Sequence, residues 1–133
     1  MIHGIGTDIV EISRIEEAFE KWGVRFLEKI FTEKEILYCY EKDNPFPHLA
    51  ARFAAKEAMI KALSGLNVRS QESKGSLKIL NFKDVEIINE SSGKPFINNA
   101  DRFTSFVIHL SMSHERSHAI ATVILERREN QGV

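Results

Sequence analysis

Residues 48–64 read HLAARFAAKEAMIKALS and carry the strongest helical pattern in the chain. Alanine, leucine, methionine, lysine and glutamate favour helices, and Gly65 follows as a predicted helix end. At about 100° per residue, the large apolar side chains fall on one stripe. The pattern predicts an amphipathic helix whose apolar stripe consists of Leu49, Phe53, Ile60 and Leu63.

Charged residues accompany this stripe: Glu57 and Lys61 fall on one edge of it, and Lys56 falls within it. Charges at a core boundary cost free energy unless they are paired or hydrated. One ordinary interpretation is an i,i+4 pair of Glu57 and Lys61, worth about 0.2–0.5 kcal/mol. Another is a Lys56 side chain that extends over the core to reach water.

Residues 2–10, IHGIGTDIV, predict a strand with Ile5, Thr7 and Ile9 on one face. Asp8 shares the other face with two glycines, although aspartate is disfavoured in strands. Glycine allows a bulky group to approach the backbone. Asp8 is therefore either a metal ligand beside a bound polyanion or the cap of a turn after a strand that ends at Thr7.

The other elements follow from local signals. Ser13–Glu16 and Thr32–Glu35 have capping-box spacing and predict helices over 13–22 and 33–42. Helices and strands come in blocks, so the pattern favours an α+β fold over a doubly wound one. We also expect a break between helices at 44–47, a polar loop at 67–76 and a turn at 91–95. Strands are expected over 106–112 and 119–125, and a weaker one over 78–89.

The chain has 133 residues and predicts one domain over 1–126 with a polar tail at 127–133. A net charge of -1 gives no basic surplus for binding nucleic acid. The N-terminus lacks the basic region of a signal peptide, and no apolar run is long enough to span a membrane. Cys39, the single cysteine, has no disulfide or zinc-binding partner. We expect a cytoplasmic protein.

Asp8 and Glu57, with lysines near Glu57, suit one chemical task well. Magnesium prefers oxygen ligands and is often held by one or two carboxylates together with substrate phosphates and water. Lysines would offset the remaining phosphate charge. The sequence offers no alternative site built on sulfur.

Residues 109–114, HLSMSH, place His109, Ser111 and Ser113 on one face of a strand. Such a face offers neutral donors to phosphates, although a half-exposed strand of a one-sided sheet is equally polar. His109, His114 and His118 are weak zinc candidates because their spacing matches no strong zinc signature. Neither serine lies in the G-x-S-x-G pattern of a nucleophile.

Taken in order, four segments resemble holo-acyl-carrier-protein synthase of the 4'-phosphopantetheinyl transferase family. The resemblance spans residues 2 to about 125 and implies a magnesium-dependent transfer of 4'-phosphopantetheine from coenzyme A to a serine of an acidic acyl carrier protein. It also implies a homotrimer of small antiparallel sheets and packed helices, with active sites between subunits. The segments are GIGTDIVEI at 4–12 with Arg14, RFAAKEA at 52–58 with Lys61, Gly93–Pro95, and SMSH at 111–114.

The resemblance implies roles for particular residues. Asp8 and Glu57 match magnesium ligands, and Lys61 matches a catalytic lysine that contacts a phosphate of coenzyme A. Nucleotide-site positions are Arg52, Gly65, Gly93, Lys94, Pro95, His109, Ser111, Ser113 and His114. Partner-binding positions are Arg14, with Lys21 and Arg25 as neighbouring basic residues.

Two alternatives to this transferase remain at this point. A non-catalytic carrier-protein or nucleotide-binding module of the same fold would not need Asp8, Glu57, Lys56 and Lys61 together. A zinc hydrolase would use the three histidines. The acceptor of the serine proton is left open among Glu57, Asp8 and a metal-linked water, with His109 as a weaker candidate.

Overall fold

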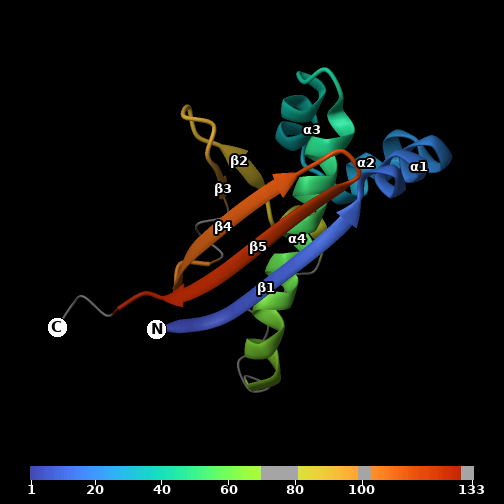
Figure 1. Cartoon of the computed structure of the whole chain (residues 1–133). Coiled ribbons are helices and arrows are strands. Elements are labelled where there is room, and N and C mark those ends of the chain that lie inside the picture. The colour runs from blue at the N-terminus through green and yellow to red at the C-terminus, as the bar shows by residue number, and fades with distance from the viewer. Residues whose placement is uncertain (70–80, 99–102, 130–133) are drawn as a thin grey trace.

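The computed structural model describes residues 1–69, 81–98 and 103–129. Figure 1 shows the long helix α4 crossing one face of the sheet, with three short helices gathered near its N-terminal half. The elements are β1 Ile2–Glu11, α1 Ile12–Trp22, α2 Val24–Ile30, α3 Glu33–Tyr40, α4 Pro45–Arg69, the 3-10 helix η1 Phe82–Asp84, β2 Ile87–Asn89, β3 Pro95–Ile97, β4 Phe106–His114 and β5 His118–Arg127.

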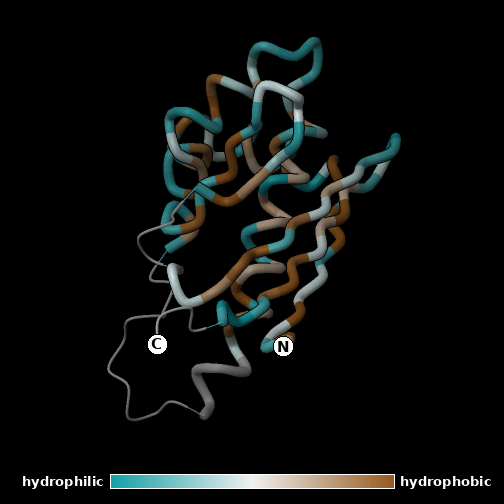
Figure 2. The backbone as a smooth tube through the Cα atoms, turned by 90° about the vertical axis from the view of Figure 1, so that its left-hand side faces the viewer, coloured by the Kyte–Doolittle hydropathy of each residue, from teal (hydrophilic) through white to brown (hydrophobic). Residues whose placement is uncertain are grey.

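The main sheet has three antiparallel strands in the order β1-β5-β4, and β2 pairs with β3 in a separate hairpin. Helices and strands are thus segregated, which confirms the predicted α+β class and the small antiparallel sheet. Apolar residues line the strands, whereas the connection between α3 and α4 is hydrophilic (Figure 2).

The sheet has one covered and one open face. Alanines, valines and leucines of β5 are buried towards α4. The opposite face exposes isoleucines: Ile5 is 65% exposed, Ile9 63% and Ile120 43%. The register aligns Ile9, Ile120 and Ser113 in one row across the three strands. Several large exposed isoleucines on one face of a small domain are typical of a surface that contacts another molecule.

Gly4 and Gly6 allow β1 to lie directly against α4. A Cβ atom on Gly6 would stand 1.9 Å from the carbonyl oxygen of Ala58, and one on Gly4 would stand 2.2 Å from that of Ala62. The prediction that these glycines admit a bulky group was correct, but that group is the backbone of α4. The close contact sets the distance between the backbone of α4 and the strand that carries Asp8.

The long helix extends beyond the prediction at both ends. It begins at Pro45 and ends at Arg69. Residues 45–47 are therefore helical and do not interrupt the secondary structure as predicted, and Gly65 does not end the helix. Proline is well suited to the first helical turn, where its missing N–H has no partner to lose. A single glycine inside a helix costs only about 1 kcal/mol, which the remaining turns offset.

The capping boxes had different outcomes. Thr32 and Glu35 form both reciprocal bonds, whereas the α1 N-cap is Glu11, without a side-chain bond. Gly23 ends α1 as predicted, but α2 follows at once and was missed because it has only 7 residues. Of the predicted strand over 78–89, residues 78–80 lie outside the described residues and only 87–89 are strand. Most of the predicted loop at 67–76 lies outside them as well, although 67–69 are helical.

At the C-terminus, β5 continues to Arg127, one residue past the predicted end of the domain. The next residue, Arg128, still donates a backbone hydrogen bond to Ser105. Pairing with the sheet therefore takes up the first two residues of the predicted polar tail, and residues 130–133 of that tail lie outside the described residues.

We predict that Gly6→Ala destabilises the protein by about 1–3 kcal/mol, the usual cost of overpacking. The new methyl group meets the Ala58 carbonyl, so β1 and α4 must separate. Thermal unfolding measures the effect, with Ser13→Ala on the exposed side of α1 as the control. An unchanged melting temperature for Gly6→Ala contradicts the close contact.

Candidate active site

A cavity of about 510 Å³ lies where β1 ends between α1 and α4. Asp8 reaches it from β1, Arg14 from α1, and Glu57 and Lys61 from successive turns of α4. The structure thus brings together four residues that are far apart in the sequence and were all predicted as site residues. The apolar part of the wall, which the sequence analysis missed, consists of Ile9, Val10, Ile15, Ala18, Phe26 and Phe53.

Asp8 lies within β1, not at its end. The strand continues to Glu11, which excludes the interpretation of Asp8 as a turn cap. The ammonium of Lys61 donates to Asp8 Oδ1 at 3.1 Å and to the Thr7 carbonyl oxygen at 3.0 Å. Lys61 therefore joins α4 to β1 by pairing with Asp8. It does not form the i,i+4 ion pair with Glu57 that was one interpretation of the sequence.

Glu57 shares this cavity and feels the charge of Asp8. Burial raises its pKa, the nearby Asp8 carboxylate raises it further, and Lys61 opposes both effects. Burial is the largest cause, so the raised pKa means that the site disfavours an ionised Glu57 when no cation is bound. Such a pair of carboxylates attracts a cation.

The donor set fits magnesium. Two carboxylates face one cavity, and within the described residues no three His, Cys, Asp or Glu side chains gather to hold a metal. A hard cation with few protein ligands keeps water and substrate phosphates in its coordination shell, as Mg2+ does. A closed zinc centre needs three or four protein ligands.

The three candidate zinc histidines lie apart in separate contacts. His109 Nε2 lies 2.9 Å from Glu126 Oε1, and His118 lies 3.5 Å from Glu115. His114 instead packs against His48, with 5.2 Å between ring centroids. These separate partners contradict the zinc hydrolase alternative for the described residues.

The predicted polar face of β4 is confirmed, but it does not face the cavity. Ser111 pairs through Thr122 with Thr7, which places it on the open face of the sheet. By the same alternation, His109 and Ser113 are on that face, and Asp8 is on the opposite one. A ligand held by Asp8 in one chain is therefore separated by the sheet from these three residues of the same chain.

Gly93, Lys94 and Pro95 also lie outside the cavity. Gly93, at φ 93°, forms the turn of the β2–β3 hairpin, where the Lys94 carbonyl accepts a bond from Glu90 and Pro95 begins β3. Gly65 is a helical residue of α4.

Arg52 is buried, with 2% of its surface exposed. Its guanidinium donates to Asn89 Oδ1 and to the His48 carbonyl and stacks 4.3 Å from the centre of the Tyr38 ring. Its polar groups are turned inwards and pack between α3, α4 and β2, and its contact with a nucleotide stays a prediction.

Lys56 is not a site residue. It is fully buried and pairs with Glu35 at 2.8 Å, so it neither extends to water nor meets a ligand. Its presence therefore does not separate an active transferase from a non-catalytic module, although the sequence analysis used it for that purpose.

Basic residues lie beside the cavity on α1 and α2. Arg25 lines a second hollow of about 370 Å³ together with Trp22, Phe26 and Lys29, and Phe26 also lines the first cavity. The Lys21 ammonium stacks 5.0 Å from the centre of the Trp22 ring, which is 62% exposed. An exposed tryptophan among cations was missed because a single residue gives no periodic signal.

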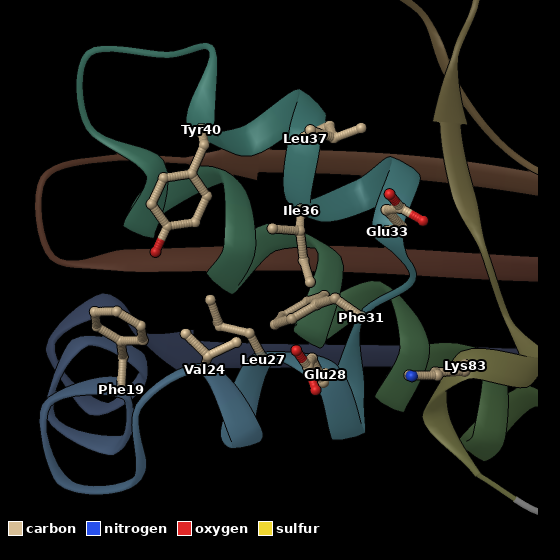
Figure 3. A pocket seen from close by; sticks show the side chains of 10 residues that line it. All are labelled: Phe19, Val24, Leu27, Glu28, Phe31, Glu33, Ile36, Leu37, Tyr40 and Lys83. Carbon is tan, nitrogen blue, oxygen red and sulfur yellow. The ribbon is translucent and has the colours of Figure 1, made fainter.

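A larger cavity, of about 660 Å³, also has charged residues in its wall: Glu28, Glu33 and Lys83. Figure 3 shows it between α2 and α3, with Phe31, Ile36, Leu27 and Val24 pointing inwards. The rest of its wall is mostly apolar, and none of the predicted site residues lines it, whereas Asp8, Arg14, Glu57 and Lys61 line the smaller cavity.

The model of the 4'-phosphopantetheinyl transferase superfamily matches residues 4–123. The chain belongs to this family. Its members are transferase enzymes, which sets aside the non-catalytic alternative. The matched range covers β1 from Gly4 onwards, the cavity residues and β5 as far as Val123.

Curated relatives and solved structures agree with this membership. A holo-[acyl-carrier-protein] synthase of Halothermothrix orenii is 46% identical over 95% of this chain and 98% of its own length. One of Thermodesulfovibrio yellowstonii is 45% identical over 94% and 99%. The crystal structure of a Bacillus anthracis holo-(acyl-carrier-protein) synthase in complex with CoA (3',5'-ADP) matches with a TM-score of 0.75, at 37% identity over 96% of this chain and 99% of that one.

We predict that Glu57→Gln stabilises the metal-free protein at neutral pH. Because burial and Asp8 raise the folded-state pKa of Glu57 above its ordinary value of 4.5, its ionisation costs stability as the pH rises above about 4.5. Melting temperatures in a chelator should be higher for the variant at pH 7, and the difference should vanish near pH 4.

The control for this experiment is Glu20→Gln on the exposed surface of α1, which should show no such pH-dependent gain. A Glu57→Gln protein that melts below the wild type at pH 7 would mean that the carboxylate stabilises the fold without a cation.

Proposed function

We propose that this enzyme transfers 4'-phosphopantetheine from coenzyme A to a serine of an acyl carrier protein, with Mg2+, and releases adenosine 3',5'-bisphosphate. The observation that carries the proposal is the cavity where Asp8, Glu57 and Lys61 meet. Relatives named holo-[acyl-carrier-protein] synthase, and a related structure solved with coenzyme A, support the choice of substrates.

The residues of the cavity divide the work of phosphoryl transfer. Asp8 and Glu57 would hold the magnesium ion, which supplies a positive charge to the pyrophosphate oxygens. Lys61 already lies at Asp8 and places a point charge where those phosphates would enter. Catalysis then rests on positioning and on neutralising charge that develops in the transition state.

The acceptor serine must lose its proton as it attacks. Its oxygen forms a bond to the phosphorus that carries the pantetheine, the bond from that phosphorus to the leaving 3',5'-nucleotide breaks, and the proton passes to a base. The proton acceptor is one of the two cavity carboxylates, Glu57 or Asp8, or a metal-linked water that one of them orients.

We also propose that the working enzyme is a homotrimer with its sites between subunits. The predicted ligand residues fall into two groups on opposite faces of the sheet, so one chain cannot use them on one ligand. Packing the isoleucine face against another copy would bury it and bring the His109 and Ser111 face towards a neighbouring cavity. Sedimentation equilibrium of the wild-type protein tests the number of subunits.

The carrier protein is proposed to dock over α1 and α2. Arg14 lines the cavity itself, and Arg25 lines the adjoining hollow beside Trp22 and Phe26. Together with Lys21, these residues offer positive charge around aromatic surface, which suits an acidic partner. The acids of α1 project from the same helix, so the docking surface is local and the net charge of the protein does not drive it.

The direct test incubates the protein with coenzyme A, Mg2+ and apo-acyl carrier protein and measures the mass gained by the carrier. We expect addition of phosphopantetheine by the wild type and at least about 100-fold slower addition by Asp8→Asn, which keeps the shape of the side chain but loses its charge. Near-normal rates for Asp8→Asn at low Mg2+ would remove Asp8 from the metal site.

The docking proposal has its own prediction. Arg14→Glu should raise the carrier-protein concentration needed for half-maximal rate about tenfold, while saturation by coenzyme A stays as in the wild type. Added salt should weaken carrier binding to the wild type by screening the same charges. The control is Lys83→Glu, an exposed residue of η1 that lines the larger cavity and not the cavity of Asp8, and it should leave carrier saturation unchanged.

A further inference from the structure

A fully buried ion pair lies one residue away from Glu57 on α4. Lys56 donates to Glu35 Oε1 at 2.8 Å and to the Phe82 carbonyl at 3.0 Å, and it also donates to the Val85 carbonyl. All three ammonium protons thus have acceptors. Both side chains are 0% exposed.

Glu35 is equally occupied. Its Oε1 accepts from the Thr32 backbone N–H at 2.8 Å, and its Oε2 accepts from the Ile87 N–H at 2.9 Å. The pair therefore connects four segments: the start of α3, the middle of α4, the end of η1 and the start of β2. No partner in this network touches the cavity of Asp8.

The position of Lys56 on α4 gives the network its importance. Successive helical residues are about 100° apart, so Glu57 projects midway between Lys56 and Ala58. On the Ala58 side, the helix backbone rests against Gly6 of β1. On the Lys56 side, it is held by the buried pair. These two contacts restrain rotation of α4 about its axis in opposite directions.

We infer that Glu35 and Lys56 are positioning residues that set the rotation of α4 and thereby hold Glu57 at the right separation from Asp8. The inference rests on the proposed function, in which these two carboxylates share a metal ion. Burying two charges is costly, and apolar residues of similar volume often stabilise a core as well or better. A network of this kind gives a defined direction to its hydrogen bonds, which apolar packing does not.

The test measures metal binding and does not depend on turnover. Mn2+ is titrated into the protein, alone and with coenzyme A, and free Mn2+ is followed by electron paramagnetic resonance. Loss of a residue that hydrogen-bonds a metal ligand directly costs about 10- to 100-fold in metal affinity, and Lys56 acts through the helix, so its loss should cost about tenfold. We expect a loss of this size for Lys56→Met, which keeps the length of the side chain and removes its charge and donors.

Glu35→Gln is the second variant, and it decides the question if Lys56→Met does not fold. Its amide keeps the size of the carboxylate but turns an N–H towards a group that now donates a hydrogen bond to Glu35, such as the Ile87 or Thr32 N–H. We expect weaker Mn2+ binding in this variant as well, at a temperature well below its melting transition.

The matched control is Phe106→Leu, a buried substitution at the far end of β4. It should lower the melting temperature without changing Mn2+ affinity, because it opens a cavity away from α4's charged residues. Wild-type affinity in both Lys56→Met and Glu35→Gln overturns the inference and leaves the proposed function intact. Failure of the wild type to bind Mn2+, or binding that survives Asp8→Asn, overturns the proposed function and the inference with it.

Discussion

The contact between β1 and α4 is the constraint on which the site depends. Two glycines bring the strand backbone against the helix backbone, closer than any side chain would permit. This contact places Asp8, two residues beyond Gly6, beside the turn of α4 that carries Glu57 and Lys61. A separation larger by one methyl group would draw the two carboxylates apart, although neither glycine touches a ligand.

The charged residues of α4 divide into two groups with opposite environments. Lys56 is buried in the core, where every donor of its ammonium has an acceptor, whereas Glu57 and Lys61 face a cavity in which burial and Asp8 raise the pKa of Glu57. Lys56 anchors the helix through buried hydrogen bonds. Glu57 is costly to ionise beside Asp8, and a bound cation would lower that cost. On one helix, Lys56 contributes to packing in the core, and the next residue, Glu57, faces the proposed site.

The two faces of the sheet serve different purposes. The face towards α4 holds small buried side chains that allow the helix to approach closely. The other face combines exposed isoleucines with the polar side chains of β4, a composition that suits contact with another protein surface more than water. Of the residues predicted for nucleotide binding, His109, Ser111 and Ser113 lie on this second face, which is why the proposed site includes a neighbouring subunit.

The sequence by itself determined the elements with strong local signals: the strand at β1, the α4 helix, the capping box at Thr32 and the alternation along β4. It also singled out Asp8, Glu57 and Lys61, because charges among apolar residues are visible in a pattern. Only the tertiary structure decided their partners. Lys61 meets Asp8, Lys56 meets Glu35, and Arg52 turns inwards, since each pairing joins segments distant in the chain and depends on a backbone approach that no local signal encodes.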